Sequence, residues 1–119
     1  MMDVTCEAEA LVKLLGTKHT LRILRYMELR DRSTRFKELE DDLKLNATSL
    51  ANRLQELVRM GVVTRTTYPE SPNKVEYSLS EKGILLTQIL DSFSLLDKLP
   101  QELVSNLYEN IVEAGIADE

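Results

Sequence analysis

The feature that most constrains the fold is a helix-forming segment followed at once by a hairpin-forming one. They read LKLNATSLANRLQELVRMG over 43–61 and VVTRTTYPESPNKVEYSLSEKG over 62–83. In the first, leucines recur at helical spacing after a capping residue, Asn46. In the second, β-branched and alternating stretches flank two prolines, which is typical of two strands joined by a turn. We therefore predict a helix over 46–60 and a hairpin over 62–79, with one strand from Val62 to Tyr68 and the other from Lys74 to Leu79.

Three further amphipathic segments precede this pair. Apolar residues recur every three or four positions over 4–15, 18–30 and 36–43, as they do in helices with one buried face. Thr17 precedes the second segment and is a suitable N-cap for it. Within that segment we expect Leu21 to point toward the core. The chain thus begins with three predicted helices.

After the hairpin the sequence returns to helical spacing. Ser80 is a suitable cap for a fifth helix, whose apolar residues continue to Leu96. Pro100 interrupts, and a last helix is predicted over 101–114. That last segment has more apolar surface than a lone terminal helix needs, so either a second chain covers it or it folds back onto its own chain.

Charge is unevenly distributed along the chain. The net charge of the chain is −5. Residues 13–82 hold 14 Lys and Arg against 10 Asp and Glu, whereas residues 83–119 hold one Lys against seven Asp and Glu. A mildly basic middle between acidic ends is expected if the middle meets a polyanion, and an uneven surface without function is equally compatible with it.

The order helix, turn, helix, hairpin is that of a winged helix-turn-helix, a mainly α fold with one small β-hairpin. The second helix of such a pair enters the DNA major groove, so polar residues opposite the leucines or on the flanks of that face become candidate DNA contacts. These are Thr48, Ser49, Asn52 and Arg53. Glu56 lies near them and must avoid phosphates, bind a cytosine amino group or pair with an arginine.

Basic residues on the hairpin and before the supporting helix are candidate phosphate contacts. We expect Arg65 and Lys74 to act from the two arms of the wing, and Arg35 and Lys37 to be weaker candidates. A wing that only covers the core, with its basic residues solvated, is the alternative for this segment.

Other classes of function find little support in the sequence. No apolar run is long enough to span a membrane, and the first residues lack the pattern of a signal peptide, so we expect a cytoplasmic protein. One histidine and one cysteine cannot form a protein metal site of ordinary ligand number, and no nucleophile–base spacing or phosphate-binding loop stands out. We therefore expect neither an enzyme nor a bound cofactor.

Five blocks of the sequence carry a resemblance to a known family. They are Cys6 near the start, GTKHTLRIL at 16–24, RFKEL at 35–39, LANRLQELVRMGVVTR at 50–65 and YPESPNKVEYSLSEKG at 68–83. In this order the chain resembles the HxlR-type regulators, a branch of the MarR-like winged-helix proteins. The chain departs from the family pattern at His19, where the family has tryptophan, and at Asn73, where a second proline is common.

The resemblance implies a homodimeric regulator of transcription that binds a two-fold DNA operator and dimerises through its terminal helices. We expect it to be a repressor, because occluding a promoter requires only binding. On this basis residues 1–99 are expected to form the DNA-binding domain, whose first helix also dimerises, and 100–119 a C-terminal dimerisation helix. Some members of the family sense oxidants through an early cysteine, which makes Cys6 a possible redox sensor, although an inert packed thiol is an open alternative. A winged helix used only for protein–protein contact is the alternative from another functional class.

Overall fold

The structure, a computed structural model, describes the backbone of residues 4–115 and the side chains of residues 7–115. Its elements are α1 (Val4–Leu15), α2 (Thr20–Arg30), α3 (Phe36–Leu43), α4 (Ala47–Arg59), β1 (Val63–Tyr68), β2 (Ser71–Leu79), α5 (Glu81–Ser92), α6 (Ser94–Lys98) and α7 (Gln101–Glu113). The chain divides into two compact units, one ending at Thr87 and the other beginning at Gln88. The first unit holds the predicted helix-turn-helix and wing.

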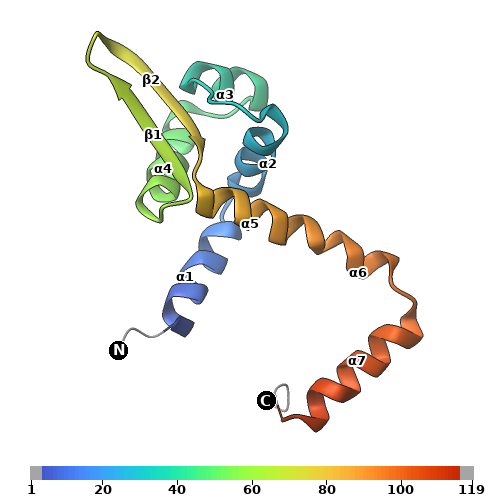
Figure 1. The fold of residues 1–119 in the computed structure, drawn as a ribbon. Helices are drawn as coiled ribbons and strands as arrows, with labels where there is room; N and C mark the ends of the chain where they lie inside the picture. Colours follow the sequence, from blue (N-terminus) through green and yellow to red (C-terminus); the bar gives the residue numbers. More distant parts are fainter. Residues whose placement is uncertain (1–3, 116–119) are drawn as a thin grey trace. The chain divides into compact units, whose positions relative to one another are not determined.

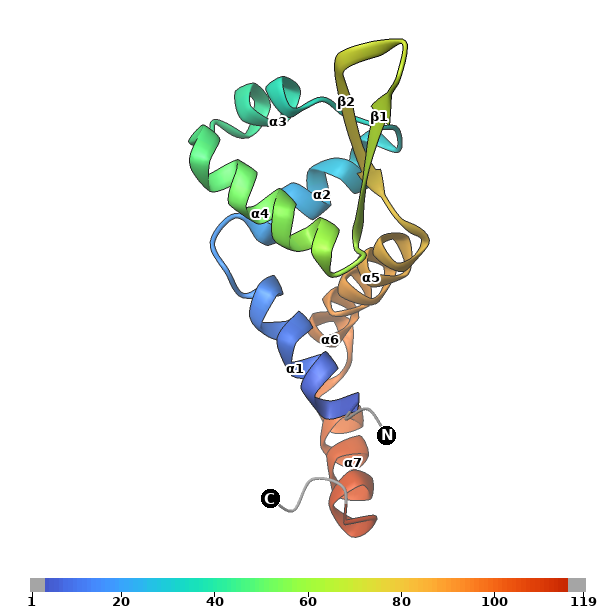
Figure 2. The same cartoon turned by 90° about the vertical axis from the view of Figure 1, so that its left-hand side faces the viewer.

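Within the first unit α2, α3 and α4 form a three-helix cluster, and the hairpin of β1 and β2 projects from it (Figures 1 and 2). The core is made by buried side chains from the three helices, from the start of β1 and from Val62 just before it: Ile23, Leu24, Met27, Leu39, Leu50, Leu54, Leu57, Val62 and Val63. The helical periodicity of the leucines in α4 therefore has the predicted consequence, because one face of this helix is completely removed from water. This fold is a winged helix-turn-helix.

The wing is an antiparallel pair in which Val63 lies opposite Leu79 and Arg65 opposite Tyr77. The second strand begins at Ser71, so the prediction that it begins near Lys74 was wrong. Pro72 does not prevent this pairing, because both strands are edges and a proline can leave its missing N–H on the solvent side. The register shifts between Thr67 and Tyr68 next to the short turn.

One isolated bridge attaches the wing to the helices. Thr34, in the segment before α3, donates its backbone N–H to the carbonyl of Tyr77 at 2.8 Å and accepts from the N–H of Tyr77 at the same distance. Thr34 is fully buried. The base of the wing is thus hydrogen-bonded to the same segment that leads into α3.

The start of α2 differs from the prediction. Thr17 does not cap this helix: its hydroxyl donates to the carbonyl of Leu14 at 2.6 Å and so closes the end of α1. His19, with φ 76° and ψ −11°, takes the N-cap position, and α2 begins at Thr20. Leu21 was expected to face the core but is 51% exposed. The face of α2 that packs into the core consists of Thr20, Ile23, Leu24 and Met27.

The junction of wing and α5 is tightly packed. Ser80 accepts a hydrogen bond from the N–H of Gly83 at 3.0 Å, which confirms its predicted role as the cap of α5. Gly83 is buried, and a Cβ built on it would lie 2.2 Å from the carbonyl oxygen of Val62. Only glycine allows this close approach of helix and strand.

In the second unit the predicted fifth helix does not continue to Leu96, because it breaks at Phe93 into α5 and α6. The hydroxyls of Ser92 and Ser94 bond back to the carbonyls of Ile89 and Asp91, at 2.6 and 2.8 Å. Such back-bonding serines bend helices. The last helix, α7, lies where the sequence predicted it.

Candidate nucleic-acid interface

The helix α4 is built to present one polar face. The side chain of Asn46 accepts hydrogen bonds from the backbone N–H groups of Thr48 and Ser49, at 2.8 and 3.3 Å, and so caps the helix as predicted. Because the leucines of α4 are buried, its opposite face must meet solvent or a ligand. The exposed polar residues on that face are Thr48, Asn52, Gln55 and Arg59, with Ser49 half-buried beside them.

Arg53 and Glu56 form an ion pair on this helix. The distance between Arg53 Nη1 and Glu56 Oε1 is 3.1 Å, and 23% and 32% of the two side chains are exposed. Of the three roles open to Glu56, the structure thus shows pairing with an arginine. The charge of Arg53 is partly neutralised, so this arginine is less available to a phosphate than an unpaired one.

The two basic residues of the wing lie on opposite faces of the hairpin. Lys74 Nζ lies 4.6 Å from the ring centroid of Tyr68, whose hydroxyl donates to Glu76 at 2.5 Å. Arg65 is opposite Tyr77 and shares the face of the buried Val63, since side chains alternate along a strand. The hairpin therefore brings Lys74 to its outer face and Arg65 to the face that looks toward the helices.

Arg65 also lines a cavity of about 360 Å³ at the base of the wing. The other residues of this cavity come from α3, α4 and β2: Phe36, Ala51, Leu54, Gln55, Val58 and Tyr77. An arginine in this position is adjacent to the middle of α4, and is therefore separated from the tip of the wing.

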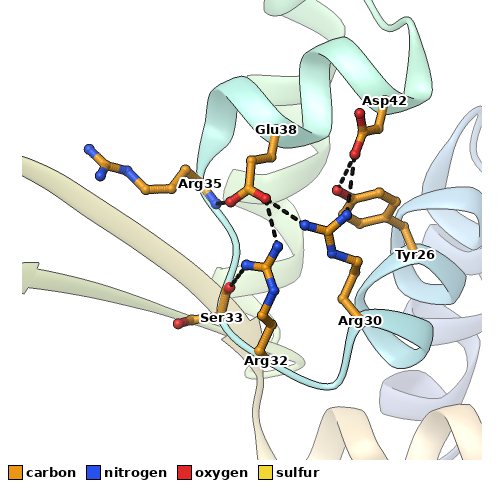
Figure 3. Close-up of polar contacts among 7 residues, drawn as sticks. All are labelled: Tyr26, Arg30, Arg32, Ser33, Arg35, Glu38 and Asp42. Carbon is orange, nitrogen blue, oxygen red and sulfur yellow. Dashed lines mark hydrogen bonds and ion pairs between the residues drawn. The ribbon is translucent and has the colours of Figure 1, made fainter.

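A carboxylate cluster organises the basic residues before α3 (Figure 3). Glu38 accepts from Arg30 at 2.7 Å, from Arg32 at 2.9 Å and from the backbone N–H of Arg35 at 3.1 Å. In Figure 3 the guanidinium of Arg35 points away from this cluster. The arrangement therefore neutralises Arg30 and Arg32 and leaves Arg35 exposed.

Lys37 is engaged on its own helix. Its Nζ lies 3.2 Å from Asp41 and 3.8 Å from Glu40, and the hydrogen bond with Asp41 raises the pKa of Lys37. The lysine side chain is 76% exposed, so these pairs are solvated and contribute little to stability. Of the two weaker candidates, Arg35 has the more available charge.

The turn between α1 and α2 meets the start of α4, which the sequence did not indicate. A cavity of about 320 Å³ is lined by Thr17, Lys18, His19, Ser49, Asn52 and Arg53. Three of these residues are predicted DNA contacts on α4, and the other three come from the turn. His19, where the chain departs from the family pattern, is the sequence feature that marks this turn.

The pKa of His19 is lowered by burial first, and then by the positive charges of Lys18, Arg22 and Arg53. The imidazole thus lies in a region of positive potential at the edge of the α4 face. Cys6, the candidate thiol sensor, belongs to α1, but its side chain lies outside those that the structure describes.

Two further features of the described residues bear on other functions. Between residues 4 and 115 no helix has the length and apolar character needed to cross a membrane. Among the side chains of residues 7–115, no three His, Cys, Asp or Glu lie together in a manner suited to a metal ion.

Comparison with known proteins agrees with the geometry of α4 and the wing. A family model described as HxlR-like helix-turn-helix matches residues 14–102. The chain is 36% identical to an HTH-type transcriptional regulator of Methanothermobacter thermautotrophicus over 91 residues, which are 76% of this chain and 68% of that protein. It is 37% identical to the HTH-type transcriptional regulator YodB of Bacillus subtilis over 82 residues, 68% of this chain and 71% of YodB.

The fold has solved counterparts. The reduced form of YodB superimposes with a TM-score of 0.67 at 32% identity, covering 80% of this chain and 90% of that one. The diamide-treated form of YodB gives a TM-score of 0.66 at 33% identity, covering 80% and 91%. With the family model spanning most of its length, the chain belongs to the HxlR-like helix-turn-helix family.

Proposed function

We propose that this chain is a sequence-specific DNA-binding transcriptional regulator that represses transcription as a homodimer on a two-fold operator. The observation that carries the proposal is α4, which buries its leucines completely and leaves a capped, polar face outward. A helix of this kind, followed by a wing, matches the major-groove reading geometry of winged helix-turn-helix proteins.

The base-reading role falls to short polar side chains at the start of α4. Thr48 and Asn52 are exposed and Ser49 is half-buried. Asn52 can make a bidentate pair with the edge of an adenine, and hydroxyls can reach either a base edge or a phosphate. The backbone N–H groups at the start of the helix favour an adjacent phosphate as well.

Phosphate contacts would come from the basic residues around this face. Arg53 would contact a phosphate if the DNA displaced Glu56 from this arginine or shared the arginine with it. Lys74 serves from the outer face of the wing and Arg65 from the base of the wing, so they would meet different phosphates of the duplex. Arg35 and Lys37 are the outlying candidates, and Arg35 is the stronger because no acid shown in Figure 3 holds its guanidinium.

The homodimer is proposed from apolar surface that the single chain leaves exposed. Between residues 81 and 113 the large apolar side chains that are 40% exposed or more are Ile84, Leu85, Ile89, Phe93, Leu95, Leu96, Leu103, Leu107, Tyr108 and Ile111. Val12 of α1 is 66% exposed. So much apolar area is unusual on a monomer and is expected of a surface that a partner covers. We assign the C-terminal helix, within 100–119, to dimerisation.

The first experiment is fluorescence anisotropy of a labelled duplex from upstream of the protein's own gene beside a scrambled duplex. Binding of the upstream duplex at least ~10³-fold tighter than the scrambled one, in the range of specific regulators, supports the proposal. Sedimentation of the free protein tests the dimer independently. Failure of both duplexes at micromolar protein would count against autoregulation and would direct attention to a protein partner.

A regulator of this kind acts where the chromosome is, so we place it in the cytoplasm. We propose no catalytic activity and no cofactor for it. A thiol-responsive variant of the proposal rests on Cys6 and on YodB, which has been solved in reduced and diamide-treated forms. The alkylation rate of Cys6 at neutral pH tests it. A rate like that of glutathione would count against an activated thiol.

A further inference from the structure

The cavity beside the start of α4 has the composition of an anion site. Lys18, His19 and Arg53 supply positive or protonatable groups, while the remaining lining residues supply two hydroxyls and one amide. None of the six lining residues carries a carboxylate. Glu56 is the nearest acid identified by contact, and it bonds to Arg53 at 3.1 Å. The site therefore has more positive charge than its one acidic neighbour can offset.

Electrostatics within the free protein point the same way. Burial, and then the cations Lys18, Arg22 and Arg53, lower the pKa of His19. Cations drawn from the turn, from α2 and from α4 thus converge on one imidazole. An anion bound among them would reverse this effect, because an opposite charge nearby favours the protonated ring.

The backbone holds the turn in an uncommon conformation. His19 has φ 76°, in the left-handed region, and residues other than glycine adopt this backbone conformation at an energetic cost. Hydrogen bonds hold this turn in place. The backbone N–H of Ile23 donates to the carbonyl of His19 at 3.0 Å, and the Thr17 and Thr20 hydroxyls lie 2.6 Å apart. This conformation places Lys18 and His19 among the residues that line a cavity with α4.

The position of the cavity indicates which anion would bind there. Ser49 and Asn52 line it and also belong to the face of α4 that is proposed to enter the major groove. A group occupying the cavity would lie at the border of that groove, where the duplex carries a phosphate. We propose that Lys18, His19 and Arg53 bind a phosphate of the DNA backbone, so that the turn between α1 and α2 is a third DNA-contacting element beside α4 and the wing. This inference rests on the proposed function.

The test compares Lys18→Ala and His19→Asn with the native protein on a generic duplex, whose backbone offers phosphates whatever its sequence. Asparagine tolerates the left-handed conformation, so His19→Asn removes the imidazole without demanding a new backbone. Lys13→Ala is the charge-matched control, because Lys13 is exposed in α1 and does not line the cavity. Thermal unfolding of each variant checks that it folds.

Lys18→Ala is expected to weaken binding by about 5- to 10-fold and to flatten the salt dependence by about one unit of the log–log slope. Lys13→Ala should leave both unchanged. His19 is the single histidine, so its ring signals in NMR can be followed without other assignments. The pKa of this ring should rise when the duplex is added.

The outcomes separate the inference from the function on which it rests. If the native protein binds the duplex while Lys18→Ala behaves like Lys13→Ala and the pKa of His19 stays fixed, the phosphate site is overturned and the regulator remains. If no duplex binds, both fail. Inorganic phosphate is added in a parallel NMR titration. If millimolar phosphate moves the ring signals and the duplex does not, the cavity takes a free anion and the DNA contact is refuted.

Discussion

Thr34 and Tyr77 exchange two backbone hydrogen bonds, each of 2.8 Å, and so join the wing to the segment that leads into the helix-turn-helix. A two-stranded hairpin is only marginally stable alone. The bridge at Thr34 acts as a one-residue third strand and attaches the hairpin to the helices. Thr34 is fully buried, so water cannot replace a lost partner at this point. This pair thus ties the base of the wing to the segment before α3.

The first prediction concerns this bridge. Thr34→Pro removes the N–H that bonds to Tyr77 and should lower the free energy of unfolding by about 2 to 3 kcal/mol. Amide exchange of Tyr77 should accelerate. Thr34→Val is the control, because it keeps the N–H and the branched shape. Equal losses in the two variants, measured by urea unfolding, would mean that the backbone bridge does not hold the wing.

Gly83→Ala should destabilise the fold although alanine is the better helix former. The gain from helix propensity is about 1 kcal/mol, but the new Cβ would lie 2.2 Å from the carbonyl oxygen of Val62. We expect a net loss of about 1 to 3 kcal/mol by urea unfolding. Gly16→Ala is the matched control, since its Cβ would approach only to 3.6 Å. A stable Gly83→Ala protein would refute the packing described here.

Asn52→Ala and Lys74→Ala should separate base reading from phosphate binding. The first should relax preference at one operator position by ~1 to 3 kcal/mol, because it removes the bidentate base contact that we propose for Asn52. The second should weaken all duplexes alike and flatten the salt dependence. Anisotropy titrations on operator variants at several salt concentrations measure both. Equal losses on every duplex for the two variants would defeat this division of roles.

Glu56→Gln should strengthen binding to every duplex by a few fold. The change removes an acid from α4 and releases Arg53 from the 3.1 Å ion pair, so that its full charge faces the phosphates. The salt dependence should become steeper. Glu28→Gln is the control, because Glu28 forms a comparable pair with Arg25 on α2. Unchanged affinity in Glu56→Gln would mean that Arg53 remains distant from the DNA.

His19 should make the stability of the free protein depend on pH. Its pKa in the folded chain is lowered below 6.5 by burial and by Lys18, Arg22 and Arg53, so the unfolded chain binds the proton more readily. This contribution to stability is therefore fully present above the unfolded pKa and is lost as the pH falls through the folded value. His19→Asn should lack that loss. Unfolding curves measured from pH 8 to pH 5 on both proteins test the difference, and parallel behaviour would contradict it.

The elements of the first unit could largely be predicted from the sequence, because local signals determine them. Asn46 caps α4, the leucine spacing defines its buried face, and Ser80 caps α5. The order of helix, helix and hairpin then limits the fold to a winged helix-turn-helix. The roles of the individual site residues in DNA binding stay predictions.

Tertiary packing decided what periodicity leaves open. Leu21 belongs to an apolar pattern wide enough for more than one buried face, and the packing of α2 buries the face that holds Ile23, Leu24 and Met27 instead. Arg65 and Lys74 look equivalent in the sequence, but the register and the bulge put them on opposite faces of the wing. Lys18 and His19 reach the α4 face only because α1 ends in a hydrogen-bonded turn. Short-range signals specify helices, strands and caps, whereas the grouping of charges from distant segments depends on how those elements pack.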